Sequence, residues 1–310
     1  MQFRATIFML ACWAIAAGGA SAQSTGSSAL ASPAPAVRWK FTRGQTLRYQ
    51  AIQETDTRRV EGELTYPLLD TKRTVDIRWY VEEVDHDGMA TITETIERVQ
   101  ESNTDSKGTR ELDSKKTRKR TAVLAGLKFS FCMSPHGRTS DVTLPSRLEQ
   151  AIEAHEPGEL SASFGRWMQL QTPSFPLPTD DTCRTQPWSK ETEWSLWSFA
   201  TMRRTRTFEY TDQQVRDGQT IAEFRISSSA QLVDDPGATT KYVLDKFAGK
   251  GSLQFDTTAG RILSVTEQSR LEGTMTVGIA ATRIRTRAKM RWRLLPGPGE
   301  PGYVAVPENK

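Results

Sequence analysis

The fold class follows from one stretch of sequence, Arg283-Ile-Arg-Thr-Arg-Ala-Lys-Met-Arg-Trp-Arg-Leu294. Every odd position in it is basic, and every even position is apolar or is Thr286. Successive side chains of a β-strand point to opposite faces, whereas on a helix these residues would surround the axis. The stretch is therefore predicted to be a strand with one buried and one cationic face. The residues expected to be buried are Ile284, Ala288, Met290, Trp292 and Leu294, and those expected to face solvent are Arg283, Arg285, Arg287, Lys289, Arg291 and Arg293.

The same alternation continues through most of the chain. Val75, Ile77, Trp79 and Val81 alternate with polar residues, and a second alternating run covers 263–277. Asp-Gly pairs at 87–88 and 217–218 separate such runs, and this pair favours a tight turn between two strands. We therefore expect antiparallel hairpins along the chain.

One helix is predicted in the middle of the sequence. Ser146 and Glu149 form a capping-box pair, and Pro157-Gly158 ends the helical pattern. The predicted fold class is mainly β, with long antiparallel strands in a curved sheet, a half-barrel or two β lobes, and one short helix in a central insertion. The expected parts are 1–22 (signal peptide), 23–36 (flexible linker), 37–143 (first β half), 144–189 (helix and Pro-rich connection), 190–296 (second β half) and 297–310 (C-terminal tail).

The start of the chain predicts export. Arg4 is followed by an apolar stretch from Thr6 to Ala17, and Ala20-Ser21-Ala22 resembles a signal-peptide cleavage site. The apolar stretch is too short to span a bilayer, so we expect a periplasmic or extracellular protein and not an integral membrane protein. Lipoprotein anchoring at Cys12 is the alternative.

Two cysteines, Cys132 and Cys183, remain after the signal peptide is removed. In an oxidising compartment an isolated pair is expected to form a disulfide, and two separate buried thiols are the alternative. The formal net charge of the whole chain is only +4, so charge matters where it is concentrated.

The two β halves carry similar turns. Gly88 and Gly218 each follow an aspartate, and Gly137 and Gly260 each precede an arginine. A duplication would place the two turns of each pair at equivalent positions in the two halves.

Two segments have metal-like spacing. Glu83-x-Asp85-x-Asp87-Gly88, with Glu94 at the twelfth position, resembles a calcium loop, but the following residues alternate like a strand, which favours an acidic hairpin turn. Cys132-x-x-x-His136 has no second ligand pair, as a structural zinc site requires. We therefore predict no metal site and no cofactor, and no motif in the sequence identifies catalytic residues.

Aromatic and basic groupings are the remaining candidates for a binding surface. Trp188, Trp194, Trp197 and Phe199 could stack on sugars or pack in a core. The run Lys115–Arg120 and the basic side chains of 283–293 could contact an anionic surface, or could be neutralised by acids of adjacent strands. The candidate acids are Glu209, Glu267 and Glu272.

Three segments carry a resemblance: Arg38–Tyr49, Phe175–Pro178 leading to Trp188, and Gly251–Asp256 before Gly260-Arg261. They resemble segments of a loose group of bacterial secreted β-rich proteins of unknown function. That resemblance implies a secreted β fold and no particular activity. Long curved strands are also similar, at the level of the fold alone, to lipoprotein-carrier half-barrels, which hold acyl chains on an apolar concave face.

These patterns predict a non-enzymatic binding or carrier protein of the cell envelope for an amphiphile or an anionic polymer. The expected partners are lipid, anionic polysaccharide or an envelope protein, and no nucleic acid is expected outside the cytoplasm. There are two alternatives: a hydrolase of unrecognised type, and a structural or interaction module without a small ligand.

Overall fold

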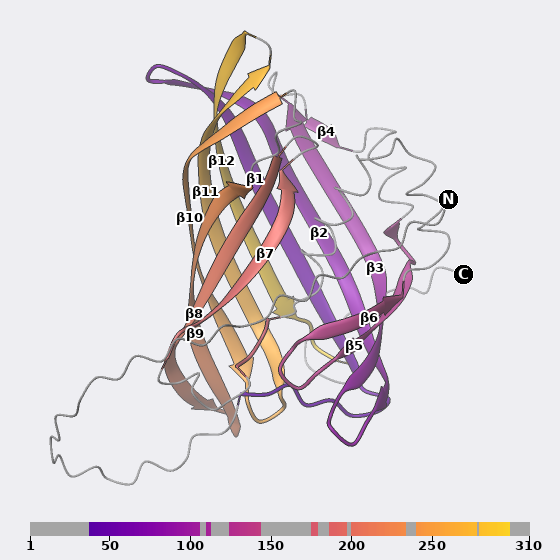
Figure 1. The fold of residues 1–310 in the computed structure, drawn as a ribbon. Helices are drawn as coiled ribbons and strands as arrows, with labels where there is room; N and C mark the ends of the chain where they lie inside the picture. The colour runs from indigo at the N-terminus through magenta and orange to yellow at the C-terminus, as the bar shows by residue number, and fades with distance from the viewer. Residues whose placement is uncertain are drawn as a thin grey trace, which may run out of the picture. The chain divides into compact units, whose positions relative to one another are not determined.

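A computed structural model describes residues 37–105, 110–112, 124–143, 175–178, 186–196, 200–233, 240–277 and 279–297. Residues 36–310 form one compact unit. Its described elements are all strands (Figure 1). They are β1 (Thr46–Glu61), β2 (Leu64–Val84), β3 (Ala90–Asp105), β4 (Arg110–Leu112), β5 (Lys128–Met133), β6 (Thr139–Thr143), β7 (Trp188–Leu196), β8 (Ala200–Arg216), β9 (Gln219–Val233), β10 (Thr240–Asp256), β11 (Arg261–Val277) and β12 (Ala280–Leu294).

All twelve strands belong to one antiparallel sheet. Its order is β6-β5-β3-β2-β1-β12-β11-β10-β9-β8-β7, and β4 pairs with β3 at one end of that strand. In the described pairings the edge strands β6 and β7 do not pair with each other, so the sheet is curved but open. Of the two arrangements left open by the sequence, the structure has one continuous sheet and not two separate lobes.

The first and last strands join the two halves at the middle of this sheet. β1 pairs with β12 from Tyr49 opposite Leu294 to Val60 opposite Arg283. Strands that are close in sequence pair on either side of this seam, β1 to β6 on one side and β7 to β12 on the other. The predicted curved antiparallel sheet is therefore confirmed.

The two predicted Asp-Gly hairpins are confirmed. Asp85 accepts hydrogen bonds from the backbone N–H groups of Asp87 and Met89, both at 2.9 Å, in the turn between β2 and β3. Asp217 and Gly218 have φ angles of 50° and 78° between β8 and β9, as a two-residue type I′ turn requires. The strand orders β2-β3-β5-β6 and β8-β9-β10-β11 match, so each Gly pair lies at equivalent turns, as a duplication would require.

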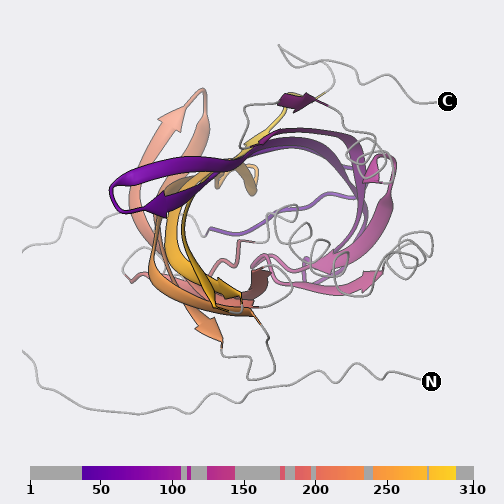
Figure 2. The same ribbon diagram turned by 90° about the horizontal axis from the view of Figure 1, so that it is seen from above.

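Side chains from strands that are not neighbours meet on one face of the sheet. The ring of Trp39 lies 5.9 Å from that of Trp79 on β2 and 5.6 Å from that of Phe255 on β10. Figure 2 shows the sheet curving around this side, which we call the inner face. We call the end of the sheet at which Trp39 packs the basal end. The inner face there carries the main hydrophobic core, which we call the lower apolar cluster. It includes Tyr49, Trp79, Phe131, Phe224, Phe255 and Trp292.

The three segments that carry the sequence resemblance meet at this basal end of the sheet. The backbone N–H of Lys40 donates to the carbonyl of Gly260 at 3.0 Å, and the indole Nε1 of Trp188 donates to the carbonyl of Pro176 at 2.7 Å. Gly260 has a φ of +66°, and an added Cβ would lie 2.4 Å from the Lys40 nitrogen, so a side chain would push the segment away. Residues 37–41 and 175–178 thus pack against the lower apolar cluster.

The predicted orientation of the last strand is confirmed. Ile284 and Trp292 are buried, and Ala288, Met290 and Leu294 are partly buried. Arg285 is partly exposed, and the other five basic residues of the stretch are exposed on the outer face. A one-residue change of register would reverse both sets.

Several predictions concern residues outside the described ranges and stay predictions. They are the signal peptide (1–22), the linker (23–36), the helix beginning at Ser146, the basic run Lys115–Arg120, and the side chains of Trp194, Trp197 and Phe199. The structure shows no disulfide at Cys132 on β5, and Cys183 lies outside the described residues, so the disulfide also stays a prediction.

Candidate functional site

A buried polar cluster interrupts the apolar inner face halfway along the strands. It consists of Arg204 and Arg206 on β8, Ser228 on β9 and Glu267 on β11, and we call it the arginine cluster. Side-chain exposure is 8% for Arg204, 18% for Arg206 and 4% for Glu267. Charged groups are rarely buried to this extent without a specific role, so the cluster is the leading candidate site.

Glu267 is the centre of the arginine cluster. Its carboxylate forms an ion pair with Arg204, and Oε2 lies 3.3 Å from Nε of Arg206. Ser228 Oγ donates to Glu267 Oε1 at 2.8 Å and accepts from Arg204 Nη2 at 3.0 Å. The Nε of Arg206 is buried and donates no hydrogen bond to any described residue. Two guanidinium groups therefore share one carboxylate.

Glycines on β10 make room for these long side chains. Gly249 lies opposite Ser228 on β9, and Gly251 lies opposite Glu267 on β11. An added Cβ on Gly249 would lie 2.9 Å from the Cβ of Ser228, and one on Gly251 would lie 3.0 Å from the Cα of Glu267. Glycine inside a strand often marks such a close approach. Because β10 has no side chain at these positions, the β8 arginines can reach β11.

Burial weakens the hydration of these cations. It lowers the pKa of Arg206 to about 10, which still leaves the guanidinium charged at neutral pH. Burial and the charge of Arg206 both lower the pKa of Arg204, and the same two causes lower the pKa of Lys190, which lies opposite Arg206 on β7. The site is thus a strip of desolvated positive charge with Glu267 as counter-ion.

A second apolar cluster lies beyond the arginine cluster, on the side away from the basal end. Met202, Tyr242 and Leu271 are buried there, and the guanidinium carbon of Arg204 lies 5.7 Å from the centre of the Phe247 ring. The surrounding side chains of this upper apolar cluster are only partly buried, namely Ala230, Leu232, Leu244, Phe247 and Met275. The inner face thus has a buried apolar end, a charged middle and a partly exposed apolar end.

Glu94 is the second buried charge-bearing group of the inner face. It is fully buried within the lower apolar cluster, where Trp79 Nε1 donates to its Oε2 at 2.8 Å. Its Oε1 has no hydrogen-bond partner among the described residues. Burial raises the pKa of Glu94 to about 8, and the Trp79 hydrogen bond opposes this shift. Glu94 is therefore mostly a neutral acid at pH 7, and it lies within β3, in agreement with the acidic hairpin turn that the sequence favours over a calcium loop.

Replacing Glu267 with glutamine is expected to lower the free energy of unfolding by about 3 kcal/mol, because it removes the carboxylate shared by two buried guanidinium groups. Urea unfolding followed by tryptophan fluorescence measures this loss. Glu209→Gln is the matched control, since the Glu209–Arg225 pair at 3.4 Å is half-exposed on the outer face. That change should cost less than about 1 kcal/mol. Equal losses in the two variants would contradict a special role for Glu267.

The structure separates the three acids proposed to neutralise the basic strand. Glu272 lies beside that strand and forms ion pairs with Arg283 at 3.6 Å and with Arg285 at 3.1 Å. Glu209 pairs instead with Arg225, and Glu267 faces the opposite side of the sheet. The proposal was thus correct for Glu272 and wrong for the other two.

The six basic residues of the strand differ in how far they are neutralised. Arg293 donates two hydrogen bonds to Gln50, which itself donates to the buried carboxylate of Asp76 at 2.8 Å. Arg287, Lys289 and Arg291 form no ion pair with any described residue. Their cross-strand acids are engaged elsewhere, since Asp56 pairs with Arg58 and Glu54 pairs with Lys72.

The other residues that the sequence singled out contact neighbouring residues of the fold. His136 lies within hydrogen-bond distance of the Pro178 carbonyl, with Nδ1 at 2.8 Å, and Cys132 is adjacent to Thr91. The ring of Trp188 is half-buried and stacks on Phe208 at 5.3 Å. Within the described residues no group of three or more His, Cys, Asp or Glu side chains could hold a metal ion.

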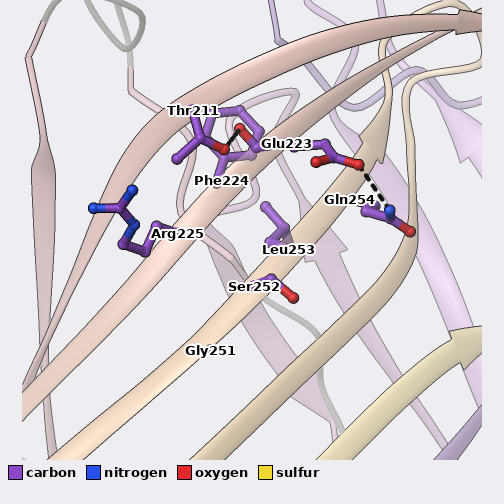
Figure 3. A pocket seen from close by; sticks show the side chains of 8 residues that line it. All are labelled: Thr211, Glu223, Phe224, Arg225, Gly251, Ser252, Leu253 and Gln254. Carbon is purple, nitrogen blue, oxygen red and sulfur yellow. Dashed lines mark hydrogen bonds between the residues drawn. The ribbon is translucent and has the colours of Figure 1, made fainter.

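A shallow hollow of about 380 Å³ lies on the outer face of the sheet, over β8, β9 and β10 (Figure 3). Its polar side chains bond to one another or to backbone: Gln254 Nε2 donates to Glu223 Oε1 at 2.9 Å, and Thr211 donates to the Glu223 carbonyl at 3.1 Å. Among the described residues that line this hollow, Glu223 is the one carboxylate.

Comparisons with known proteins identify the fold but no family. No family model and no curated protein matches the chain. A structure of lipovitellin that describes lipid–protein interactions is similar, with a TM-score of 0.51 and 11% identity over 86% of this chain and 27% of that one. This chain therefore spans about a quarter of the lipovitellin chain, and the likeness shows the fold alone.

Two further structures are similar over most of their length but with low scores. DynF from the dynemicin biosynthesis pathway of Micromonospora chersina has a TM-score of 0.19 at 10% identity, covering 88% of this chain and 92% of its own. An outer membrane channel from Pseudomonas putida F1 has a TM-score of 0.19 at 6% identity, covering 83% and 97%. Neither score supports an argument. Separately, the described part of the chain contains no helix that is long and apolar enough to cross a membrane.

Sequence reasoning missed the arginine cluster, although two signals were present. Glu267 and Ser269 fall on the apolar parity of the 263–277 strand, where Val265 and Leu271 point inward. Gly249 and Gly251 alternate inside a strand. Arg204 and Arg206 also share the parity of the apolar Met202 and Phe208, but no local signal shows that β8 and β11 approach each other across β10.

Proposed function

We propose that this protein is an exported, non-enzymatic carrier that holds an acidic amphiphile on its inner face. The observation that supports it is the arginine cluster, which lies between a closed apolar end and a partly exposed apolar end. The acidic head group would bind the Arg206 guanidinium, which is 18% exposed and whose described acidic partner, Glu267, it shares with Arg204. The hydrocarbon chain would lie along the upper apolar cluster.

Physical chemistry favours an acidic ligand over a neutral one. A desolvated guanidinium binds a carboxylate or phosphate strongly, and in a bidentate geometry where space allows. The partly exposed side chains Leu232, Leu244, Phe247 and Met275 offer the apolar surface that a chain of methylene groups requires. The similarity of the fold to that of lipovitellin agrees with this function. Export depends on the signal sequence predicted above.

Displacement of a fluorescent long-chain fatty acid tests the proposal. The fatty acid should bind the purified protein, and the unlabelled acid should displace it at least tenfold more effectively than the alcohol of equal chain length. Arg206→Gln should weaken binding of the acid about tenfold and leave binding of the alcohol unchanged. Arg225→Gln, on the outer face, is the control and should behave like the parent protein. An acid-to-alcohol preference that survives Arg206→Gln would refute the head-group site.

A further inference from the structure

Two hairpin turns project from the end of the sheet opposite the basal end. Because Val60 on β1 lies opposite Arg283 on β12, the β1–β2 turn (61–64) and the end of the β11–β12 hairpin, where Val277 lies opposite Ala280, extend in the same direction. Figure 1 shows both turns at the top of the sheet. We call this the tip end. The upper apolar cluster lies on the half of the inner face nearer to it.

The tip end carries most of the exposed large apolar side chains of the described residues. Leu64 is 61% exposed, Ile279 is fully exposed, and Tyr66 is also exposed. Leu69 and Val243 lie on the same half of the sheet, so five of the eight such residues in the described part of the chain belong to this end. By register Tyr66 and Leu69 face the inner side, whereas Val243 faces the outer side. Arg59 lies over the Tyr66 ring, 5.3 Å from its centre. Such a concentration at hairpin turns indicates a contact surface.

A row of cations begins at the same turn and continues along β12. Arg283 follows the turn, and Arg287, Lys289 and Arg291 come next on the outer face. Exposed Lys250 on β10 lies beside this row, opposite Gln268. Arg270 on β11 lies opposite Arg287 but forms an ion pair with Glu272. The outer face along β12 is thus cationic, and its end is apolar.

We propose that the tip end and the β12 row dock on a lipid bilayer that contains anionic lipids. A flat bilayer can touch the convex outer face of the sheet along only a narrow strip. β12 and its turn form such a strip. Apolar and aromatic side chains enter the interfacial layer of a bilayer, while Arg and Lys face its anionic lipids. Leu64 and Ile279 at the two turns, and Val243 on the outer face, would enter that layer. An acidic polysaccharide would satisfy the cations but offers no apolar layer for these three side chains.

This proposal goes beyond amphiphile carriage, because it concerns a different face of the sheet. It also gives the ligand site a direction: the partly exposed apolar cluster lies on the same half of the sheet as the docking turns. A bilayer at the tip end would therefore be the nearest source or destination of an acyl chain held on the inner face.

Sedimentation with vesicles tests the docking. The protein should bind vesicles of phosphatidylcholine mixed with phosphatidylglycerol and bind pure phosphatidylcholine weakly. Binding should fall strongly in about 1 M NaCl, where the Debye length is about 3 Å. Each cation near an anionic leaflet contributes about a fivefold factor, so the double variant Arg287→Ser with Arg291→Ser should bind about 30-fold more weakly.

The apolar turns are tested separately. Leu64→Ser with Ile279→Ser should weaken vesicle binding at least about tenfold, including the fraction that persists in high salt. Val215→Ser is the matched control, since Val215 is 71% exposed at the opposite end of the sheet. Arg216→Ser with Arg225→Ser is the control for charge. Both controls should bind like the parent protein.

The outcomes that overturn the docking are distinct from those that overturn the carrier. Unchanged vesicle binding by the Leu64 and Ile279 variant would overturn it. The docking would also be overturned if the parent protein bound no vesicles but bound an acidic polysaccharide, and if the Arg287 and Arg291 variant lost that binding. Arg206→Gln should dock normally, and the turn variant should bind the fatty acid normally, so each proposal can fail alone.

Discussion

Replacing Trp292 with aspartate is expected to leave residues 37–296 unfolded at neutral pH. Trp292 is 3% exposed within the lower apolar cluster, and its ring lies 6.5 Å from that of Tyr49. Loss of a buried tryptophan costs about 3–5 kcal/mol, and a buried unpaired carboxylate adds to this. The total approaches or exceeds the stability of a typical domain, about 5–15 kcal/mol. Circular dichroism and urea unfolding measure the result.

Arg291→Ser is the matched control for this prediction. It changes the preceding residue of the same strand, whose side chain is exposed on the outer face. The free energy of unfolding should change by less than about 1 kcal/mol, because surface substitutions away from specific contacts have small effects. A large loss in this variant, with little loss in Trp292→Asp, would show that the two faces of β12 had been assigned in reverse.

The faces of β12 could be predicted from sequence because alternation is a local signal. Hairpin turns at Gly88 and Gly218 were predictable for the same reason, since turn chemistry depends on adjacent residues. The pairing of β1 with β12 was not, because no local pattern relates Tyr49 to Leu294. The arginine cluster was not predictable for another reason, since it depends on side chains of β8 reaching β11 over the glycines of β10, and no local pattern relates residues three strands apart.

Glu94→Gln is expected to stabilise the protein in alkaline solution and to have little effect in acid. The ordinary pKa of a glutamate is 4.5, and burial raises that of Glu94 to about 8. Below pH 4.5 the carboxyl group is protonated in both the folded and the unfolded chain. Between these values the unfolded chain releases the proton and the folded chain retains it, so the free energy of unfolding falls as pH rises. Above pH 8 the loss is complete.

The size of this effect follows from the shift. Each pKa unit corresponds to about 1.4 kcal/mol, so the parent protein loses about 5 kcal/mol between the two limits. Glutamine has the same size and cannot ionise, so Glu94→Gln should be more stable than the parent by up to that amount above pH 8. Urea unfolding across the pH range measures the difference.

Glu209→Gln is the control for the pH series, because Glu209 is half-exposed on the outer face. Its stability difference from the parent should stay small throughout. If the difference between Glu94→Gln and the parent were the same at every pH, Glu94 would not have a shifted pKa in the folded protein.

The central seam between β1 and β12 has a consequence for how the chain folds. Its partners, from Tyr49 and Leu294 to Val60 and Arg283, are separated by more than two hundred residues. Contacts of such long sequence separation are slow to form, because the entropy of closing the loop is lost before the pairing is gained. Until β12 has been synthesised, β1 keeps a free edge next to the hydrophobic residues Leu47, Tyr49 and Ala51. An incomplete chain is thus expected to be prone to aggregation at this edge.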